Sequence, residues 1–258
     1  MPGPESDGPV PDGTRVDVVP LDTPRLLSAA WDDVLAVSFP AAELTPLDAL
    51  QAEHRAGRLL ADGVVRDGHV VAAIVASWSP RTHVVLVDYL AIVPGSRGGG
   101  LGGALLDGAL ERWRRELDPA LVLAEVEHPA HHAASASFGD PTARLRFYAR
   151  HGAHVLALPY FQPGITGPGS PRVPALLLVA LGTGADDAVP AGPLRAFLTE
   201  HLVACEGMLA TDSATRRLLD AAAGEAVALV DPADPAALAT VPVGLLEGDE
   251  RRAPPSPA

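Results

Sequence analysis

The stretch "SRGGGLGGALL", residues 96–106, decides how the rest of the sequence is interpreted. Glycine loses more conformational freedom on folding than any other residue, so this many glycines in one short segment need a physical reason. Apolar residues then recur four apart, which predicts an amphipathic helix that begins inside the stretch. The first backbone N–H groups of a helix have no internal partner and, with the helix dipole, attract anions. Because glycines leave these groups accessible, the stretch predicts a turn that binds phosphate.

The residues before this turn predict strands and two helices. The nearly unbroken apolar run "HVVLVDYLAIV" (83–93) indicates a central strand, in which Asp88 is the only charged residue. Residues 59–78 predict two strands joined at Asp67-Gly68, a strong hairpin signal. Further upstream, the spacing predicts a strand over 15–21 and helices over 24–39 and 47–55.

The residues after the glycine turn continue the alternation of strands and helices. We expect a helix from Leu101 to Asp118, a strand over 120–127 and a helix that Asp140 caps. Further strands are expected at 154–161 and 173–181, and helices at 193–208 and 213–223. This order predicts an α/β (α+β) fold, with a mixed, mostly antiparallel central sheet flanked by helices and a C-terminal helical extension.

The expected domain boundaries follow composition. Residues 1–14 and 251–258 are rich in proline and are expected to be disordered tails, while 15–182 form the main domain and 183–250 the helical extension. The net charge is −13, from 19 basic and 32 acidic residues, which argues against nucleic acid as a partner. We see neither a signal peptide nor an apolar run that could span a membrane, and therefore expect a cytoplasmic protein. The single cysteine, Cys205, excludes an intramolecular disulfide and is interpreted as a packing residue.

Several phosphate ligands could occupy the glycine turn. Gly98, Gly100 and Gly103 match the spacing G-x-G-x-x-G of dinucleotide-binding folds, but the motif follows a hairpin and does not open a β-α-β unit. A nicotinamide-dependent oxidoreductase is therefore an alternative of lower rank. A P-loop would need a lysine at the end of the turn, and the stretch has none.

Two motifs, in order, carry a resemblance to a known family. "LAIVPGSRGGGLGGALL" (90–106) resembles the acetyl-CoA-binding motif of the GCN5-related N-acetyltransferases, the GNAT family, with Arg97, Gly100 and Gly102 at its defining positions. "RLRFYARHGA" (144–153) resembles the family's Phe-Tyr-x-x-x-Gly helix end. The resemblance covers about residues 15–182.

The resemblance implies acetyl-CoA as co-substrate and no metal. The pantetheine arm would pair with the strand backbone, the amide near Ile92 would stabilise the oxyanion, and the pyrophosphate would lie on the glycine turn. The implied cofactor-binding residues are Ala91, Ile92, Val93, Arg97, Gly98, Gly99, Gly100, Leu101, Gly102 and Gly103.

The resemblance also suggests catalytic residues. Tyr148 occupies the position of the family's tyrosine near the CoA sulfur and is the candidate acid for the leaving thiolate. For the base, which must take a proton from the amine, the sequence offers Glu127 and Asp88, with Glu125 on the same strand face as Glu127. A salt bridge from these carboxylates to Arg144 or Arg146, with the proton leaving through water, is the alternative.

The implied function is an N-acetyltransferase that acts on a primary amine of a small molecule or peptide, by direct attack in a ternary complex. A non-catalytic acyl-CoA sensor of the same fold is the alternative. The histidines at 128, 131 and 132 match no zinc framework and are expected in a solvated loop. For the C-terminal helices, packing on the domain, covering the acceptor cleft and forming a homodimer all stay open.

Overall fold

The computed structural model describes residues 16–41, 43–96, 100–135, 139–164, 169–184 and 186–245. The strands are β1 (Val19–Pro20), β2 (Leu59–Arg66), β3 (His69–Ser79), β4 (Val84–Ile92), β5 (Leu121–Glu127), β6 (His154–Leu156), β7 (Leu176–Ala180), β8 (Ala188–Pro190) and β9 (Ala226–Val230). The helices are α1 (Pro24–Ala30), the π-helical η1 (Trp31–Leu35), α2 (Ala36–Ser38), α3 (Leu47–Arg55), α4 (Leu101–Leu117), α5 (Pro141–Arg150), α6 (Ala191–Glu206), α7 (Ser213–Ala221) and α8 (Pro235–Leu238). Both expected tails lie outside the described residues.

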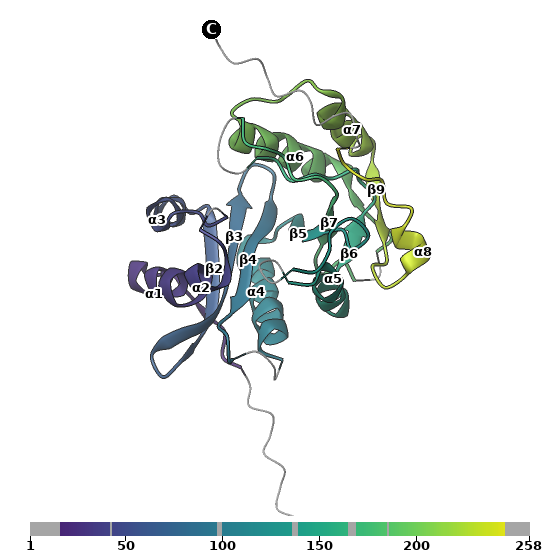
Figure 1. Ribbon diagram of the computed structural model, residues 1–258. Helices are drawn as coiled ribbons and strands as arrows, with labels where there is room; N and C mark the ends of the chain where they lie inside the picture. The colour runs from purple at the N-terminus through teal and green to yellow at the C-terminus, as the bar shows by residue number, and fades with distance from the viewer. Residues whose placement is uncertain are drawn as a thin grey trace, which may run out of the picture.

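One sheet organises the molecule, with its strands in the order β1-β2-β3-β4-β5-β7-β6-β9-β8 (Figure 1). Among the named strands of the described ranges, only β4 and β5 run parallel. The expected mixed, mostly antiparallel sheet is confirmed.

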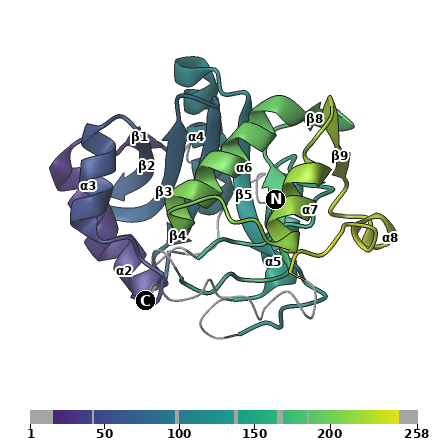
Figure 2. The ribbon, with the colours of Figure 1, turned by 90° about the horizontal axis from the view of Figure 1, so that it is seen from above.

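Side-chain alternation along the strands separates two layers of helices. On one face, Val85, Val87 and Val122 join a single apolar cluster with α4 and α5. On the other face the core is divided: one cluster packs β2–β4 against α1, η1 and α3, and another packs β4, β5 and β7 against α6 and α7. Figure 1 shows α1–α3 and α4 on opposite sides of the strands, and Figure 2 shows α6 lying across the sheet.

Local sequence signals account for most element boundaries. The β2–β3 hairpin turns at Asp67 and Gly68, whose φ values of 50° and 81° suit the type I′ turn that this dipeptide favours. The side chain of Asp140 accepts a hydrogen bond from the Thr142 backbone N–H at the start of α5, as expected of a cap. The first strand is shorter than expected, because only Val19 and Pro20 pair with β2 at the sheet edge.

A buried ion pair fixes α4 on the sheet. Arg112 donates to both carboxylate oxygens of Asp62 on β2, at 2.6 and 2.7 Å, and Trp113 Nε1 donates to the same carboxylate at 2.9 Å. Asp62 is 1% exposed, so these donors satisfy a carboxylate that would otherwise be costly to bury. The position of the glycine turn at the start of α4 is thereby tied to β2.

The C-terminal extension differs from the sequence prediction. It contains the expected helices α6 and α7, but it also adds two strands to the sheet: β9 pairs with β6, and β8 pairs with β9. The sequence prediction named the helices of this extension and not its strands. The reason is that β8 and β9 are short and acquire their hydrogen-bond partners only from segments distant in sequence.

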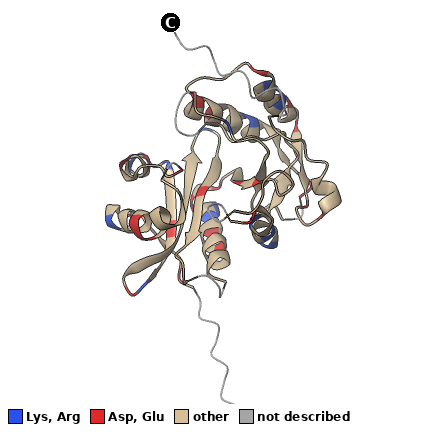
Figure 3. Ribbon diagram, in the orientation of Figure 1, with Lys and Arg blue, Asp and Glu red and all other residues tan. Residues whose placement is uncertain are grey.

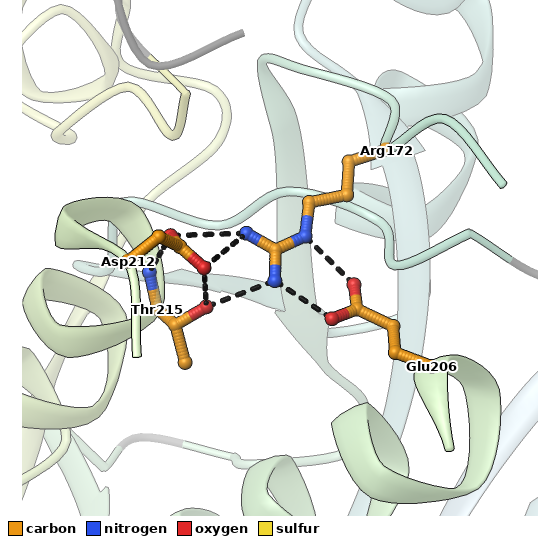
Figure 4. A network of polar contacts seen from close by, with 4 residues as sticks. All are labelled: Arg172, Glu206, Asp212 and Thr215. Atoms are coloured by element: carbon orange, nitrogen blue, oxygen red, sulfur yellow. Dashed lines mark hydrogen bonds and ion pairs between the residues drawn. The ribbon is translucent and has the colours of Figure 1, made fainter. Parts of the chain in front are cut away.

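Arg172 joins the extension to the segment before β7 (Figure 4). Its guanidinium donates to both oxygens of Glu206 at 2.7 Å, to both oxygens of Asp212 at 3.1 Å, and to the Thr215 hydroxyl at 3.0 Å. It also stacks over the Phe161 ring, 4.5 Å from the ring centroid. The end of α6 and the start of α7 are thus held against the main domain.

Candidate active site

The β4–β5 ladder opens in the middle of the sheet. Parallel pairing runs from Val84 opposite Leu121 to Val87 opposite Ala124 and ends there, although both strands continue. On the other side of β4, Ala76 pairs with Val87 and Val75 with Tyr89, so Asp88 is the extra residue of a β-bulge. A bulge bends its strand. The two strands therefore separate at this point.

Carboxylates gather where the strands separate. Asp88 of β4 and Glu125 and Glu127 of β5 continue the face that carries Leu86 and Leu123, between the two helix groups. Figure 3 shows this as acidic segments in the middle of β4 and β5, which are otherwise largely uncharged. The expectation that Glu125 and Glu127 share a face with each other is confirmed, and the structure adds Asp88 to it.

Asp88 is held by a neutral donor. The Ser77 hydroxyl donates to Asp88 Oδ2 at 2.7 Å. Burial among the central strands raises the pKa of Asp88 to about 7, the Ser77 hydrogen bond opposes this rise, and the charge of Glu125 adds to it. The side chain nevertheless keeps an exposed surface. Water therefore reaches the carboxylate, but the protein around it keeps the carboxylate incompletely solvated.

Glu125 is positioned by two residues that the sequence analysis missed. Its carboxylate accepts hydrogen bonds from the Tyr160 hydroxyl and, at 2.7 Å, from Gln162 Nε2. Tyr160 is 1% exposed, and burial followed by the charge of Glu125 raises its pKa well above the usual range, so its hydroxyl stays a donor. No local signal marks these residues, because they follow β6 and meet Glu125 only through the tertiary fold.

Glu127 differs from Asp88 in having a cationic partner. Arg144 Nη1 lies 3.5 Å from Glu127 Oε2, and His132 Nδ1 lies 3.8 Å from Oε1. Glu43 belongs to the same group: its own burial raises its pKa, the charge of Glu127 adds to this, and Arg144 opposes it. The salt bridge to Arg144 that the sequence offered as an alternative therefore involves Glu127.

The segment that carries Glu43 is fastened at two points. The Tyr89 hydroxyl donates to the Glu43 carbonyl at 2.8 Å and accepts from the Thr45 backbone N–H at 3.0 Å. Trp31 Nε1, in the π-helical turn, donates to the Thr45 carbonyl at 3.1 Å. π-Helical turns are frequent at functional sites. This segment holds Glu43 close enough to Glu127 and Arg144 for their charges to act on it.

Tyr148 lies on the opposite face. It is 6% exposed on α5 and packs in the same apolar cluster as Val87 and Ala124, the last residues of the parallel ladder. Burial raises its pKa to about 12, and Arg144 opposes the rise. Its hydroxyl is therefore protonated at neutral pH.

The strand backbone beyond the ladder is open toward β5. Ala91 and Ile92 pair with β3, and in the described ranges no strand pairs with them on the other side. The Val93 N–H bonds to Val71 on the β3 side, so the N–H of Ile92 points to the open side. Of the three residues expected to bind through main-chain groups, Ala91, Ile92 and Val93, it is Ile92 whose N–H points to this open side, while the Val93 N–H is bonded to Val71.

The glycine turn is described from Gly100 onward. Gly100, with φ 75°, lies before α4, and no side chain of the described residues caps the helix there. A Cβ at Gly102 would lie 3.2 Å from Ile92 Cδ1, and one at Gly103 would lie 2.5 Å from the His151 ring. Gly102 and Gly103 therefore pack closely against Ile92 and His151, while the first amides of α4, including that of Leu101, are those that a helix leaves without an internal partner. Arg97, Gly98 and Gly99 lie outside the described residues.

The comparison with protein families identifies this architecture. The sequence model of the acetyltransferase (GNAT) family matches residues 28–153. The chain carries a GNAT acetyltransferase domain. Family members generally use acetyl-CoA as co-substrate, and the matched range includes the separating strands, the glycine turn and Tyr148.

Solved structures similar to this chain include further GNAT proteins. One from Bacteroides thetaiotaomicron is 23% identical over 66% of this chain and 88% of its own, with a TM-score of 0.49. The ribosomal-protein-S18-alanine N-acetyltransferase from Escherichia coli is 18% identical over 66% and 97%, with a TM-score of 0.43. A tandem GNAT protein from the clavulanic acid biosynthesis pathway is 26% identical over 57% and 46%, with a TM-score of 0.46. No curated protein matches the chain.

The histidine loop beside the GNAT site is only partly solvated. His128 is 6% exposed, its Nδ1 accepts from the Ala130 backbone N–H at 3.1 Å, and burial lowers its pKa. His132 Nε2 bonds to the Pro174 carbonyl at 2.9 Å. The expectation of a solvated loop was therefore wrong for His128, because the loop bonds back to Pro174 and Ala175, just before β7. Within the described ranges, no group of acidic, histidine or cysteine side chains is arranged to hold a metal.

Two further features lie outside this GNAT site. A groove of about 800 Å³ lies between Thr82 and helices α6 and α7, and none of the predicted site residues lines it. Of the helices in the described part of the chain, none is long and apolar enough to cross a membrane.

Proposed function

We propose that the GNAT domain transfers the acetyl group of acetyl-CoA to a primary amine. The observation that supports this is the end of the β4–β5 ladder. It leaves Asp88 on one face of the sheet and Tyr148 packed on the other, with an open strand edge between them. Two reactants can meet across such an opening, each with a proton-transfer group beside it.

The described residues fit acetyl-CoA, which would supply an activated thioester. The uncapped start of α4 would hold the pyrophosphate, and the open edge at Ala91 and Ile92 would hold the pantetheine arm. The N–H of Ile92 would stabilise the oxygen of the reacting carbonyl. Gly100 would leave room for the pyrophosphate, because even a Cβ built there has no atom of the described residues within 4 Å.

Asp88 would accept the proton that the ammonium group must lose before its nitrogen can attack. A pKa of about 7 suits this role, because the group is then substantially ionised at neutral pH and still basic enough to take a proton. Glu125 would keep the ammonium group in place by charge, since Tyr160 and Gln162 hold its carboxylate without neutralising it. Glu127 would act at the edge of the site, where Arg144 shares its charge.

Tyr148 would donate its hydroxyl proton to the thiolate as the carbon–sulfur bond breaks. Its raised pKa keeps the proton available at any pH below about 12. The tyrosine would recover a proton from solvent after the product leaves. Carboxylates without a basic partner in the described residues favour a cationic acceptor. The proposed acceptor is therefore the amine of a small molecule or peptide, and the proposed place of the reaction is the cytoplasm.

An amine-panel assay tests this proposal. The protein is incubated with acetyl-CoA and a panel of primary amines, and acetylated products are detected by mass. We expect the wild type to transfer the acetyl group to at least one of the amines. Asp88→Asn should reduce this transfer without weakening acetyl-CoA binding. Binding of acetyl-CoA with no transfer to any amine would favour the sensor alternative, and absence of binding would contradict both.

A further inference from the structure

Helix α6 of the C-terminal extension brings two chemically versatile side chains to the carboxylate site. His201 and Cys205 lie one turn apart on this helix, and α6 lies over β4. Burial lowers the pKa of His201 and raises that of Cys205 to about 11, and in both cases the charge of Glu125 also acts on the group. Asp88 acts on Cys205 as well. Glu206 of α6 itself acts on both groups too, and this turn of α6 therefore lies within electrostatic reach of the carboxylate site.

The ring of His201 is fixed in orientation. It stacks on Phe197, with centroids 5.4 Å apart and 12° between the planes. Its Nδ1 lies 3.9 Å from the Cys205 Sγ on the same helix. The other ring nitrogen, Nε2, takes no part in that contact, and the charge of Glu125 on β5 acts on the ring.

His201 Nε2 is buried without a hydrogen-bond partner. Only four buried side-chain polar atoms in the described part of the chain lack one, and among them His201 is the one on whose ring the charge of Glu125 acts. Buried polar groups are nearly always paired, so an unpaired one in a candidate binding site points to a missing ligand. Because its pKa is lowered, the ring is neutral at pH 7. The protonated Cys205 thiol can donate to Nδ1, which leaves the ring proton on Nε2.

We propose that the Nε2–H of His201 hydrogen-bonds to the acceptor, and that the acceptor is a primary amine with a neutral oxygen close to the reacting nitrogen. The inference rests on the proposed acetyl transfer for the identity of this site. The oxygen is a hydroxyl or an amide carbonyl, because a carboxylate would be repelled by Asp88 and Glu125. The C-terminal extension then has a defined role: α6 selects the acceptor.

Matched pairs of amines test this inference through binding and turnover. One pair is trans-2-aminocyclohexanol and cyclohexylamine, which differ by a hydroxyl; the other is alaninamide and sec-butylamine, which differ in the amide. Dissociation constants are measured by titration of the full chain in the presence of CoA, and kcat/KM is measured with acetyl-CoA. For the wild type, we expect the oxygen-bearing member of at least one pair to be favoured about tenfold, which is the size of one net hydrogen bond. The preferred pair distinguishes a hydroxyl from a carbonyl.

Two substitutions assign the preference to His201. His201→Phe keeps a ring to stack on Phe197 and removes both nitrogens, so the preference should disappear while the amines without oxygen bind as before. His201→Gln places an amide donor near the position of Nε2 and should restore part of the preference. Melting temperature and CoA affinity are measured for both variants to confirm that they fold.

The outcomes separate this inference from the proposed function. Preferential binding without acetyl transfer would support the role of His201 and contradict the enzymatic proposal. Transfer with no preference in either pair would overturn the inference and leave the proposed function standing. A preference that survives in a folded His201→Phe protein would also overturn it, and failure of every amine to bind would overturn both.

Discussion

Asp88 and Glu125 are the first residues of their strands beyond the last pair of the parallel ladder, Val87 and Ala124. They lie on the same face of the sheet, and each is held by neutral donors: Asp88 by Ser77, and Glu125 by Tyr160 and Gln162. Among the described residues, neither forms an ion pair with a basic side chain. Two carboxylates without a basic partner in the described residues favour a cation at this place, where the bulge at Asp88 bends the strand.

The pH dependence of acetyl transfer should reveal Asp88 as the base. A base must be ionised to act, so the wild-type rate should fall as pH drops below about 7, the pKa to which burial raises Asp88. Asp88→Asn should lower kcat about 10²-fold and remove this inflection from the pH–rate profile. Glu127→Gln is the matched control: because Arg144 already pairs with Glu127, it should mainly raise the amine KM. An unchanged inflection in Asp88→Asn would assign the base elsewhere.

Ser77→Ala gives a second test of the same assignment. The Ser77 hydroxyl stabilises the ionised form of Asp88, so its removal should move the inflection to higher pH.

The raised pKa of Asp88 also makes the stability of the fold depend on pH. A carboxyl whose pKa is higher in the folded than in the unfolded state stabilises the fold below its unfolded pKa, near 4, and loses this contribution as pH rises to about 7. Asp88→Asn should therefore raise the melting temperature at pH 8 more than at pH 4.

Tyr148→Phe should separate chemistry from binding. The substitution keeps the ring in the apolar cluster and removes only the hydroxyl. If Tyr148 protonates the leaving thiolate, kcat should fall about 10²-fold or more with little change in the acetyl-CoA dissociation constant. Because its pKa is about 12, Tyr148 should contribute no inflection to the wild-type profile below pH 11. Unchanged turnover would mean that water protonates the thiolate.

Gly100 allows an isosteric test of the phosphate site. Its φ of 75° is tolerated by asparagine and aspartate better than by other side chains, and a Cβ there has open space. Gly100→Asp adds a negative charge at the start of α4, whereas Gly100→Asn adds the same bulk without it. Calorimetry should show CoA binding to Gly100→Asp at least about tenfold weaker than to Gly100→Asn. Equal affinities would argue that the pyrophosphate does not lie at this turn.

Arg172 should prove important for stability. Arg172→Met leaves Glu206 and Asp212 without their shared cation, and Arg172 and Glu206 are only 16% and 12% exposed. We expect a loss of about 3 kcal/mol in the free energy of unfolding by urea denaturation. Arg58→Met is the control: it breaks a pair with Glu53 that is about half exposed, and should lower the free energy of unfolding much less than Arg172→Met does.

The effect of Arg172→Met should also depend on pH. Burial raises the pKa of Asp212, but hydrogen bonds from the Thr215 backbone N–H and from Arg172 outweigh it, so the pKa is below its usual value. A depressed pKa stabilises the fold above the unfolded pKa, and this contribution is lost as pH falls through the folded pKa. The difference in stability between wild type and variant should therefore narrow below about pH 4. A difference that stays constant would assign the effect to the loss of packing on Phe161.

The sequence by itself determined the elements whose signals are local. Backbone dihedral preferences placed the hairpin at Asp67-Gly68, and the Asp140 cap placed the start of α5. Apolar period placed α4, and the residue types of the glycine turn that precedes it indicated a phosphate site, whereas acetyl-CoA followed from the resemblance to the GNAT family. These signals work because each depends on residues within one or two turns of each other in the chain.

Only the tertiary structure decided which carboxylate faces the opening and what surrounds it. The sequence does not distinguish Glu127 from Asp88, but in the fold Glu127 pairs with Arg144, whereas Asp88 accepts a hydrogen bond from Ser77. Tyr160 reaches Glu125 from 35 residues away, and β9 reaches β6 only after α6 and α7 intervene. Such contacts carry no local pattern, because they depend on burial and pairing between segments that only packing brings together. The fold class was therefore readable from the chain, whereas the electrostatics of the site had to come from its packing.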